Sequence, residues 1–526
     1  MSVNDIIMGI RLVSGLPTYF GGPLTITESR LILRRRLERR EEDFLDFMRR
    51  SVLANPASPY IPLFRQAGCE PGDLERLVRR DGLEGALQAL FRAGIYLTAD
   101  EYKGRRAVVR GNFSRTINPM QLRNPLMVPH YLATTSGSRG EATHVPLDIA
   151  CIRDRAVNVY LALAARGGVR WHNAVWMIPG IGPVLWYSSW ARPVARWFWP
   201  IPMEARNLPS RYRWSARLVV WTSRLAGTSI PSPEPVSPDS PLPIARWMAK
   251  TIGDGKVPHV WGYPSSALRL CREALNAGVH LAGSQFTLTG EPVTEACLSA
   301  IRRVGAEAVP DYGSADSGGS VGQGCLSPGA PDDIHIFSDL NALIQADGPP
   351  FPPRALLLTS IRPTAPFVFL NVSMGDVARM SERRCGCPME KLGWPSHIQE
   401  IRSFEKLTIG GMTFLDADII RILEEILPRK FGGGPSEYQL VEESMTDGPP
   451  RLRLLIHPSV PAVDPVAVSE TFWDALGTGS ATRRLMALQL KRGGFLDVER
   501  QPPLATFTGK ILHVRAGTGV SPGGFR

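Results

Sequence analysis

Residues 285–316 read QFTLTGEPVTEACLSAIRRVGAEAVPDYGSAD, and this stretch decides the fold. Apolar residues with high strand propensity predict a strand at 286–289, the apolar spacing predicts a helix over 294–304, and a second strand begins at 308–309. Residues 257–277, just upstream, show the same order of strand and helix. Such alternation predicts an α/β fold with a largely parallel sheet that helices cover on both faces.

Further helices and strands are predicted on both sides of this core. Residues 27–50 alternate charged side chains with leucine and phenylalanine, which predicts an exposed amphipathic helix. A nucleic-acid-binding arm is the alternative there, but acidic residues offset the basic ones. From about residue 402 the pattern becomes that of a small α+β domain. The other expected elements are helices at 74–93, 147–165, 416–426 and 466–476, antiparallel strands within 354–380, and strands at 437–441, 451–456 and 511–515.

The composition is that of an ordinary globular protein with an excess of positive charge. A chain of 526 residues predicts about two to four domains. Its 60 basic and 49 acidic residues give a net charge of +11, which suits a polyanionic partner such as nucleic acid, an anionic membrane or a phosphorylated small molecule. The sequence has no nucleic-acid recognition motif, no apolar run of about 18 residues and no persuasive signal peptide. We therefore expect a cytoplasmic protein without a nucleic-acid partner, and a monomer and a homodimer both remain open.

Tryptophan is concentrated in a segment that we call the Trp/Pro-rich insert, residues 170–245. Eight of the twelve tryptophans lie between residues 171 and 221, and six prolines follow between 231 and 243. One interpretation is a buried or interdomain subdomain followed by an extended linker. The other is an acyl tunnel or a peripheral membrane contact through residues 171–221, because tryptophan favours boundaries between water and apolar groups and arginines are interleaved.

A loop rich in glycine and hydroxyl side chains, TTSGSRG, occupies residues 134–140. Its glycines allow a phosphate to approach the backbone, and its hydroxyls, N–H groups and arginine supply donors. The candidate phosphate-binding residues are Ser136, Gly137, Ser138, Arg139 and Gly140. The loop is not a Walker motif, because no Gly-Lys-Ser/Thr closes it, and an ordinary surface turn is the alternative.

Polar turns also follow several predicted strands, at the edge where open α/β sheets bind ligands. After two neighbouring strands come Gly290, Glu291, Pro292, Asp311, Tyr312, Gly313 and Asp316. A carboxylate such as that of Asp316 can hold Mg²⁺ against phosphate oxygens. Asp376 ends a later strand and can accept hydrogen bonds from both hydroxyls of a ribose. Lys510, after a flexible glycine, can bring a point charge to a reacting carboxylate.

The order of these motifs resembles that of the acyl-adenylate-forming enzymes, and within that superfamily the phenylacetate–CoA ligase branch. Six motifs, each weak alone, carry the resemblance over residues 132–515. They are Ser136–Gly140, Gly290–Pro292, Asp311–Asp316, Gly375–Asp376, Arg402–Gly411 and Gly509–Lys510. The resemblance implies a large N-terminal AMP-binding domain, residues 1–400, with mainly parallel layered sheets and a small barrel-like region. It also implies a small mobile α+β domain, residues 401–526, that carries Lys510.

The resemblance further implies a reaction and a role for each matching residue. The reaction is the ATP-dependent activation of a hydrophobic or aromatic carboxylic acid to an acyl-adenylate, followed by transfer to the thiol of CoA. Ser136–Gly140 would cradle the β- and γ-phosphates of ATP. Gly290–Pro292 would border the adenine, and the side chain of Tyr312, between Asp311 and Gly313, would stack on it.

The other matching residues would act on the ribose and on the reacting groups. Asp376 would hold the ribose with help from Arg402 at the hinge. Asp316 would bind Mg²⁺, and Lys510 would stabilise the transition state of adenylation.

Several positions depart from the family pattern. They are Arg139 for a usual Thr or Ser, Ala142 for Pro, Asp316 for Glu, and Phe404-Glu405 for two aspartates. These departures leave open an unusual substrate, altered hinge motion or reduced adenylation. The alternative functions are transfer of the adenylate to a carrier-protein thiol or an amine, and a non-catalytic nucleotide-binding homologue.

Four residues from two distant parts of the chain form a candidate metal site. Cys385 and Cys387 present two thiols in a tight turn, and Cys325 precedes His335 in a predicted strand at 333–337. Three sulfurs and one nitrogen suit a tetrahedral Zn²⁺ site. The alternative is a group of buried thiols with a hydrogen-bonded histidine. Some members of the resembled branch carry such a cluster, which implies a structural zinc here.

Overall fold

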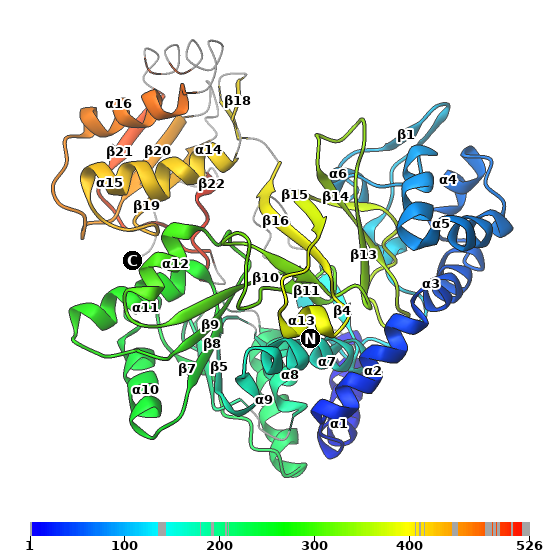
Figure 1. Ribbon diagram of the computed structural model, residues 1–526, viewed down its shortest axis with the longest axis horizontal. Helices are drawn as coiled ribbons and strands as arrows, with labels where there is room; N and C mark the ends of the chain where they lie inside the picture. Colours follow the sequence, from blue (N-terminus) through cyan, green and yellow to red (C-terminus); the bar gives the residue numbers. More distant parts are fainter. Residues whose placement is uncertain are drawn as a thin grey trace.

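The computed structural model places an N-terminal α/β part and a smaller C-terminal α/β part (Figure 1). The described residues are 3–134, 144–178, 180–190, 194–205, 208, 210–404, 407–409, 412–414, 416–443, 451–478, 487, 491, 495–506 and 509–517. Within these ranges no helix is both long and apolar enough to cross a membrane.

One twelve-stranded sheet runs through the N-terminal part in the order β13-β14-β15-β16-β12-β11-β10-β9-β8-β5-β6-β7. Neighbouring strands are parallel from β7 to β10 and antiparallel from β10 to β13. The parallel half confirms the predicted alternation of strand and helix. The antiparallel strands continue the same sheet, and the small barrel-like region stays a prediction. The strands are β5 (His172–Trp176), β6 (Arg196–Trp199), β7 (Glu234–Pro235), β8 (Pro258–Gly262), β9 (Gln285–Thr289), β10 (Glu307–Ser314), β11 (Gly319–Gln323), β12 (Ile334–Ile336), β13 (Asn341–Gln345), β14 (Ala355–Ser360), β15 (Val372–Glu382) and β16 (Ser396–Ser403).

Helices cover both faces of the parallel half, as predicted. In β5, Ala174 and Trp176 belong to one hydrophobic core and Val175 to the other. Successive side chains of a strand point to opposite faces, so these two cores lie on the two sides of the sheet. The first core is completed by α10 (Leu242–Gly253), α11 (Pro264–Asn276) and α12 (Glu295–Arg302), and the second by α7 (Ile149–Ala165) and α8 (Ile181–Ser188).

The first 134 residues are mostly helical. The helix predicted over 27–50 is interrupted at Arg39, so α2 ends at Glu38 and α3 begins at Arg40. The charged residues of this helix were predicted to be exposed, but Arg36 is buried and pairs with Asp154 at 2.5 Å. The elements are α1 (Val3–Gly21), α2 (Ile26–Glu38), α3 (Arg40–Met48), α4 (Ile61–Gln66), α5 (Pro71–Arg92), α6 (Ala99–Tyr102), and the hairpins β1 (Val108–Arg110) with β2 (Phe113–Arg115) and β3 (Tyr131–Thr134) with β4 (His144–Leu147).

The C-terminal part has its own sheet, in the order β21-β20-β19-β22, and its own hydrophobic core, which includes Leu440, Leu454 and Phe472. The predicted division between residues 400 and 401 stays a prediction. Strand β16 of the large sheet continues to Ser403, and the hydrophobic core of the C-terminal part begins at Ile419. The elements are β17 (Leu407–Ile409), β18 (Met412–Phe414), α14 (Asp416–Arg421), α15 (Leu427–Phe431), β19 (Tyr438–Glu443), β20 (Arg451–Ile456), α16 (Pro465–Leu476), β21 (Leu496–Glu499) and β22 (Val514–Gly517).

The Trp/Pro-rich insert is mainly core. Its six tryptophans between residues 171 and 199 are buried, whereas Trp214 and Trp221, on α9 (Ser210–Leu225), are exposed. The Pro-rich stretch supplies β7 at the edge of the large sheet, where a missing N–H does not interrupt a ladder. The interpretation as a buried subdomain therefore holds for most of the insert, and only α9 offers tryptophan to a membrane.

Candidate functional site

Lys510 contacts the turn that follows β9. Its Nζ donates a hydrogen bond to the carbonyl oxygen of Gly290 at 3.2 Å, and it lies 5.1 Å from the ring centre of Tyr263. The next backbone N–H, that of Ile511, donates to Oε1 of Glu291 at 2.9 Å. Burial lowers the pKa of Lys510, and the nearby carboxylate of Glu291 opposes this shift. The C-terminal segment is thus held against the predicted adenine-binding turn at two consecutive residues.

Gly290 is required at its position for two reasons. Its φ of 78° lies in the left-handed region, which favours glycine. A Cβ added there would lie 2.6 Å from Nζ of Lys510. With a Cβ at residue 290, the ammonium group of Lys510 would have to move from its present position.

Glu291 connects this turn to the first turn of α11. Its carboxylate accepts hydrogen bonds from the backbone N–H and the hydroxyl of Ser265, both at 2.8 Å. Burial raises the pKa of Glu291, and the donors of Ser265 and the charge of Lys510 oppose that rise. A carboxylate at a helix N-terminus satisfies donors that have no partner inside the helix. With Pro292 after it, Glu291 holds the turn in place rather than presenting a free acid.

Tyr312 and Asp376 lie beside this turn. Thr289 of β9 pairs with Asp311 of β10 in register, so the residues that follow them, Gly290 and Tyr312, are neighbours across the two parallel strands. The hydroxyl of Tyr312 donates to Oδ2 of Asp376, on β15, at 2.8 Å. The sheet therefore brings together four predicted site residues from three separate motifs.

A cavity of about 110 Å³ opens next to Tyr312 and Asp376. Its polar lining includes Ser314 and Ser317, and its apolar lining comes from the antiparallel strands: Val321, Leu343, Leu356, Leu358 and Met374. Gly313 allows the backbone to pass here, since a Cβ on it would lie 2.2 Å from the carbonyl oxygen of Gly319. Of the predicted adenine- and ribose-binding residues, Tyr312, Gly313 and Asp376 line this cavity.

Asp311 and Asp316 are both buried, and burial raises the pKa of each to about 6. Asp311 accepts hydrogen bonds from Thr289, at 2.8 Å, and from Ser320. Its carboxylate is therefore satisfied within the fold.

Asp316 differs, because Oδ2 has a long contact of 3.4 Å with the hydroxyl of Tyr102 and Oδ1 is buried without a partner among the residues that the structure describes. The positive charge of Lys103 opposes the rise of its pKa. A buried carboxylate oxygen without a partner fits a hard cation such as Mg²⁺.

Arg402 lies on β16, opposite Val377 and therefore one position from the pair formed by Asp376 and Ser403. Its Nη1 donates to Oδ2 of Asp332 at 2.8 Å. The arginine is thus close to the strand that carries Asp376 but is engaged by another carboxylate.

Two predicted motifs lie wholly or partly outside the described residues. The phosphate loop, with Ser136, Gly137, Ser138, Arg139 and Gly140, is one, and only its flanking strands β3 and β4 are described. The second is the hinge, where Phe404 is described and Glu405 is not.

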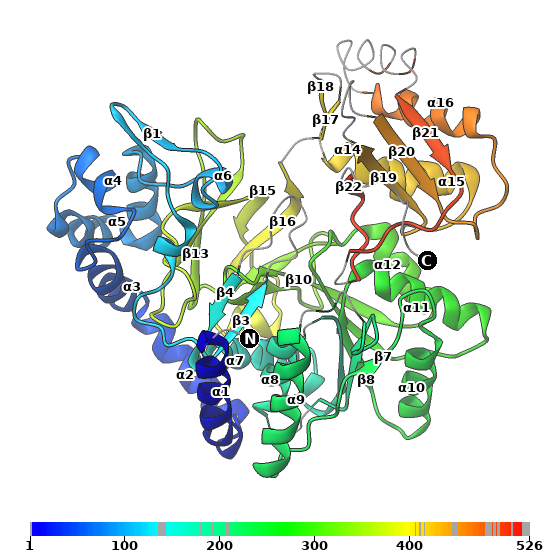
Figure 2. The same cartoon turned by 180° about the vertical axis from the view of Figure 1, so that it is seen from behind.

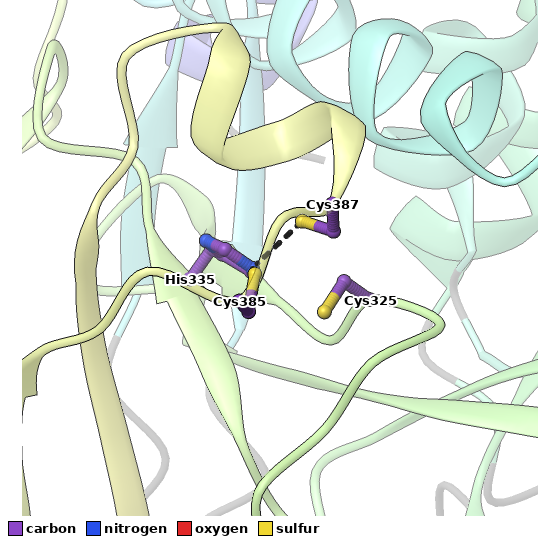
Figure 3. A group of neighbouring side chains, drawn as sticks. All are labelled: Cys325, His335, Cys385 and Cys387. Carbon is purple, nitrogen blue, oxygen red and sulfur yellow. Dashed lines mark hydrogen bonds between the residues drawn. The ribbon is translucent and has the colours of Figure 1, made fainter.

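The four candidate metal ligands converge at a separate place (Figure 3). One ligand atom from each of Cys325, His335, Cys385 and Cys387 lies within 4.8 Å of all the others. Nε2 of His335 is 3.6 Å from Sγ of Cys385 and 3.3 Å from Sγ of Cys387. Burial raises the pKa of Cys325 to about 12 and lowers that of His335 to about 4. The donor set is that of a closed zinc site.

The imidazole of His335 is oriented by a neighbour. Its Nδ1 lies 2.7 Å from the carbonyl oxygen of Trp394, so that nitrogen carries the proton and Nε2 is left as the ligand atom. Such a partner is typical of metal-bound histidine, although it also satisfies a buried histidine without a metal. The orientation is the one that a metal site needs.

Several contributors to the site were not predicted from sequence. Tyr263 and Ser265 contact Lys510 and Glu291, Tyr102 contacts Asp316, and Trp394 orients His335. For the first two a signal was present, because the sequence Tyr263-Pro264-Ser265 stands at the end of a predicted strand and the start of a predicted helix. Tyr102 and Trp394 carry no such signal.

No protein-family model matches the chain, and no curated protein matches it. Solved structures do match. A 2-hydroxyisobutyryl-CoA ligase in complex with 2-HIB-AMP and CoA is 15% identical over 94% of this chain and 91% of its own, with a TM-score of 0.46. The anthranilate CoA ligase AuaEII in complex with anthranoyl-AMP is 12% identical over 72% and 65%, with a TM-score of 0.44. O-succinylbenzoate coenzyme A synthetase from Bacillus subtilis, with ATP and magnesium, is 13% identical over 73% and 69%, with a TM-score of 0.41.

At such identities and TM-scores, the activity of this chain has to be argued from its own residues. The phenylacetate–CoA ligase branch stays a prediction.

Proposed function

We propose that this protein activates a hydrophobic or aromatic carboxylic acid with ATP to an acyl-adenylate and then transfers the acyl group to the thiol of CoA. The observation that carries the proposal is the position of Lys510 against Gly290, beside the pair formed by Tyr312 and Asp376. A basic side chain thus lies against the turn that follows β9, and on the neighbouring strand β10 an aromatic side chain is hydrogen-bonded to a carboxylate.

The proposed reaction requires that the carboxylate be positioned next to the α-phosphate of ATP and that the developing negative charge be neutralised. A carboxylate is unreactive toward a thiol because its oxygen is a poor leaving group, and attack on the α-phosphate of ATP converts it to a mixed anhydride with release of pyrophosphate. Lys510 would neutralise the charge that grows as this bond forms. Tyr312 would stack on the adenine and Asp376 would accept hydrogen bonds from the ribose, in place of the Tyr312 hydroxyl that it accepts now.

Asp316 would hold Mg²⁺ through the buried oxygen that has no partner. Bound there, the cation would neutralise phosphate charge. Ser136–Gly140 would bind the departing phosphates, with Arg139 as an additional cation. Arg402, on β16, would help Asp376 to hold the ribose, and we expect the C-terminal domain beyond that strand to rotate before the thiol enters.

Cys325, His335, Cys385 and Cys387 would bind a structural Zn²⁺. With four protein ligands the site has no open position, so it would link β12 to the segment that follows β15 and take no part in the reaction. The link would stiffen the antiparallel half of the sheet, from which Asp376 projects.

The test is acid-dependent exchange of labelled pyrophosphate into ATP, screened over aryl, fatty and amino acids. We expect exchange with at least one hydrophobic or aromatic acid, followed by a thioester when CoA is added. Exchange without a CoA thioester would refute transfer to CoA and leave a carrier-protein thiol or an amine as the acceptor. ATP binding without exchange for any acid would refute the proposal and leave a nucleotide-binding homologue.

A further inference from the structure

Helices α1 and α9 pack side by side at one end of the molecule, and both expose apolar side chains (Figures 1 and 2). Among the described residues, fourteen large hydrophobic side chains are exposed, and six of them lie on these two helices. The six are Ile6, Ile7, Ile10, Trp214, Trp221 and Leu225, with exposed fractions of 40% to 67%. Scattered exposed apolar residues are normal, but such a concentration indicates an interaction surface.

The contact between the helices places these side chains together. A Cβ on Gly9 would lie 3.7 Å from Cδ1 of Leu218, so Gly9 of α1 faces Leu218 of α9. Trp214 and Trp221 stand four residues before and three residues after Leu218, on the same row of α9. On α1, Ile6 stands three residues before Gly9 on the same row, whereas Ile10 follows Gly9 directly and lies about 100° around the helix. Trp214, Trp221 and Ile6 therefore border one seam. Together with Ile7, Ile10 and Leu225, exposed on the same two helices, they form a surface that we call the α1–α9 ridge.

The ridge is also basic. Helix α9 contains Arg211, Arg213, Arg217 and Arg224 and no acidic residue. Arg217 and Arg224 are exposed at the same spacing as the two tryptophans, and within the described part of the chain no ion pair involves either of them. Arg11 is exposed on α1, whose one acidic residue is Asp5. Apolar and cationic side chains thus share the outer face.

We infer that the α1–α9 ridge binds the surface of an anionic phospholipid bilayer. A helix that lies in the plane of the interface places tryptophan and leucine among the acyl chains and arginine among the anionic headgroups, which is the arrangement on α9. A second copy of the chain fits less well, because a twofold contact would bring Arg217 and Arg224 close to the same residues of the copy. The ridge lies at the opposite end from the C-terminal sheet in both views, so binding leaves the Lys510 site accessible (Figures 1 and 2). This inference does not depend on the proposed function.

Co-sedimentation of the full-length protein with vesicles tests the inference. We expect it to bind vesicles of 70% phosphatidylcholine and 30% phosphatidylglycerol, to bind pure phosphatidylcholine far less, and to be released by salt. The double variant Trp214→Ser/Trp221→Ser should lose binding by at least ~10-fold. Arg217→Gln/Arg224→Gln should lose about 25-fold, because each cation near an anionic surface contributes about five-fold. The matched control Leu326→Ser/Val466→Ser, at exposed apolar positions elsewhere, should bind like the wild type.

Two measurements keep the outcomes distinct. Thermal unfolding of each variant shows that it is folded, and light scattering after size exclusion gives the oligomeric state. Wild-type protein that stays in the supernatant with both vesicles, or ridge variants that bind as the wild type does, would overturn the inference. A dimer that the tryptophan variant dissociates, with no vesicle binding, would assign the ridge to a second copy instead.

Discussion

The ammonium group of Lys510 donates a hydrogen bond to the carbonyl oxygen of Gly290 at 3.2 Å, although 220 positions of sequence separate the two residues. Glu291 accepts the next backbone N–H, from Ile511, at 2.9 Å. Two consecutive residues of the C-terminal segment are therefore fixed to two consecutive residues of the turn after β9. The geometry holds a cation against this turn and the ring of Tyr263, so we expect residue 290 to be a sensitive position for activity.

Gly290→Ala should impair the site more than it impairs the fold. The substitution adds a Cβ at 2.6 Å from Nζ of Lys510 and places alanine at a φ of 78°. The left-handed backbone costs about 1–2 kcal/mol for a residue with a Cβ. Displacement of the ammonium group should in addition lower pyrophosphate exchange by at least ~10-fold.

Gly278→Ala is the matched control, since its φ is 64° and a Cβ there meets nothing within 4 Å. Both variants should lose similar free energy of unfolding in urea, and only Gly290→Ala should lose exchange. Equal exchange by the two variants would show that the contact with Lys510 does not matter for activity.

Asp316 should make stability depend on pH in a direction opposite to that of a salt-bridged aspartate. Burial raises its pKa to about 6 from an ordinary value of 3.8. Between these values the folded chain keeps a proton that the unfolded chain releases, so this contribution is fully present below pH 4 and is lost as the pH rises through 6. A difference of about two in pKa corresponds to about 3 kcal/mol.

Asp316→Asn removes this dependence, because the amide is neutral at every pH. In the absence of Mg²⁺ the variant should equal the wild type near pH 4 and exceed it by up to ~3 kcal/mol near pH 7.5, as measured by urea unfolding. Asp311, whose pKa is also raised to about 6, stays in both proteins and cancels from the comparison. Mg²⁺ should stabilise the wild type and not the variant. The same difference at both pH values would contradict the burial of an ionisable Asp316.

The cysteine cluster should hold about one zinc ion per chain in freshly purified protein. Metal analysis should find it, and Cys385→Ser should remove it, because one of four ligands is lost. Replacement by Co²⁺ should give the intense charge-transfer absorption of metal-bound thiolates. Cys271→Ser, at a buried cysteine of α11 outside the cluster, is the control and should keep the metal. Only traces of zinc in the wild type would leave the cluster as buried thiols around a hydrogen-bonded histidine.

The sequence predicted the local parts of the fold well. Strands β8 and β9 and helices α11 and α12 were expected close to their observed bounds, because each has a periodic apolar face within fewer than fifteen residues. Strand β10 was expected only at 308–309 with a polar turn after it, but it runs from Glu307 to Ser314, so Asp311, Tyr312 and Gly313 lie within the strand. The continuity of the large sheet was not predictable in this way. Pairing of β12 with β16 joins residues more than 60 positions apart, and no local pattern reports it.

The C-terminal strands show where local reasoning fails. The last strand was expected at 511–515 but is β22, Val514–Gly517, and Ile511 forms an isolated bridge with Ala505. Strand β21 was not predicted at all. Helix α1 was also missed, since its apolar residues lie on more than one side and Pro17 interrupts the pattern.

The site residues could be nominated from sequence, but their partners could not. Gly290, Tyr312, Asp376 and Lys510 were expected to act together, and the structure places them as neighbours or hydrogen-bonded pairs. That Asp311 is satisfied by Thr289 and Ser320, whereas one oxygen of Asp316 has no partner, depends on strand register and loop packing. Neither the strand register nor the loop packing can be read from the spacing of residues in the sequence.

The most direct test of the central claim is the pyrophosphate exchange of Lys510→Ala with the acid that gives the best exchange in the wild type. Loss of one positive charge aimed at developing negative charge should reduce exchange by about 100-fold or more. Lys491→Ala is the control, because this lysine also lies in the C-terminal part but pairs with Glu470 at 3.4 Å. The account predicts a large loss for Lys510→Ala with normal thermal unfolding and no loss for Lys491→Ala. Full exchange by Lys510→Ala would contradict it.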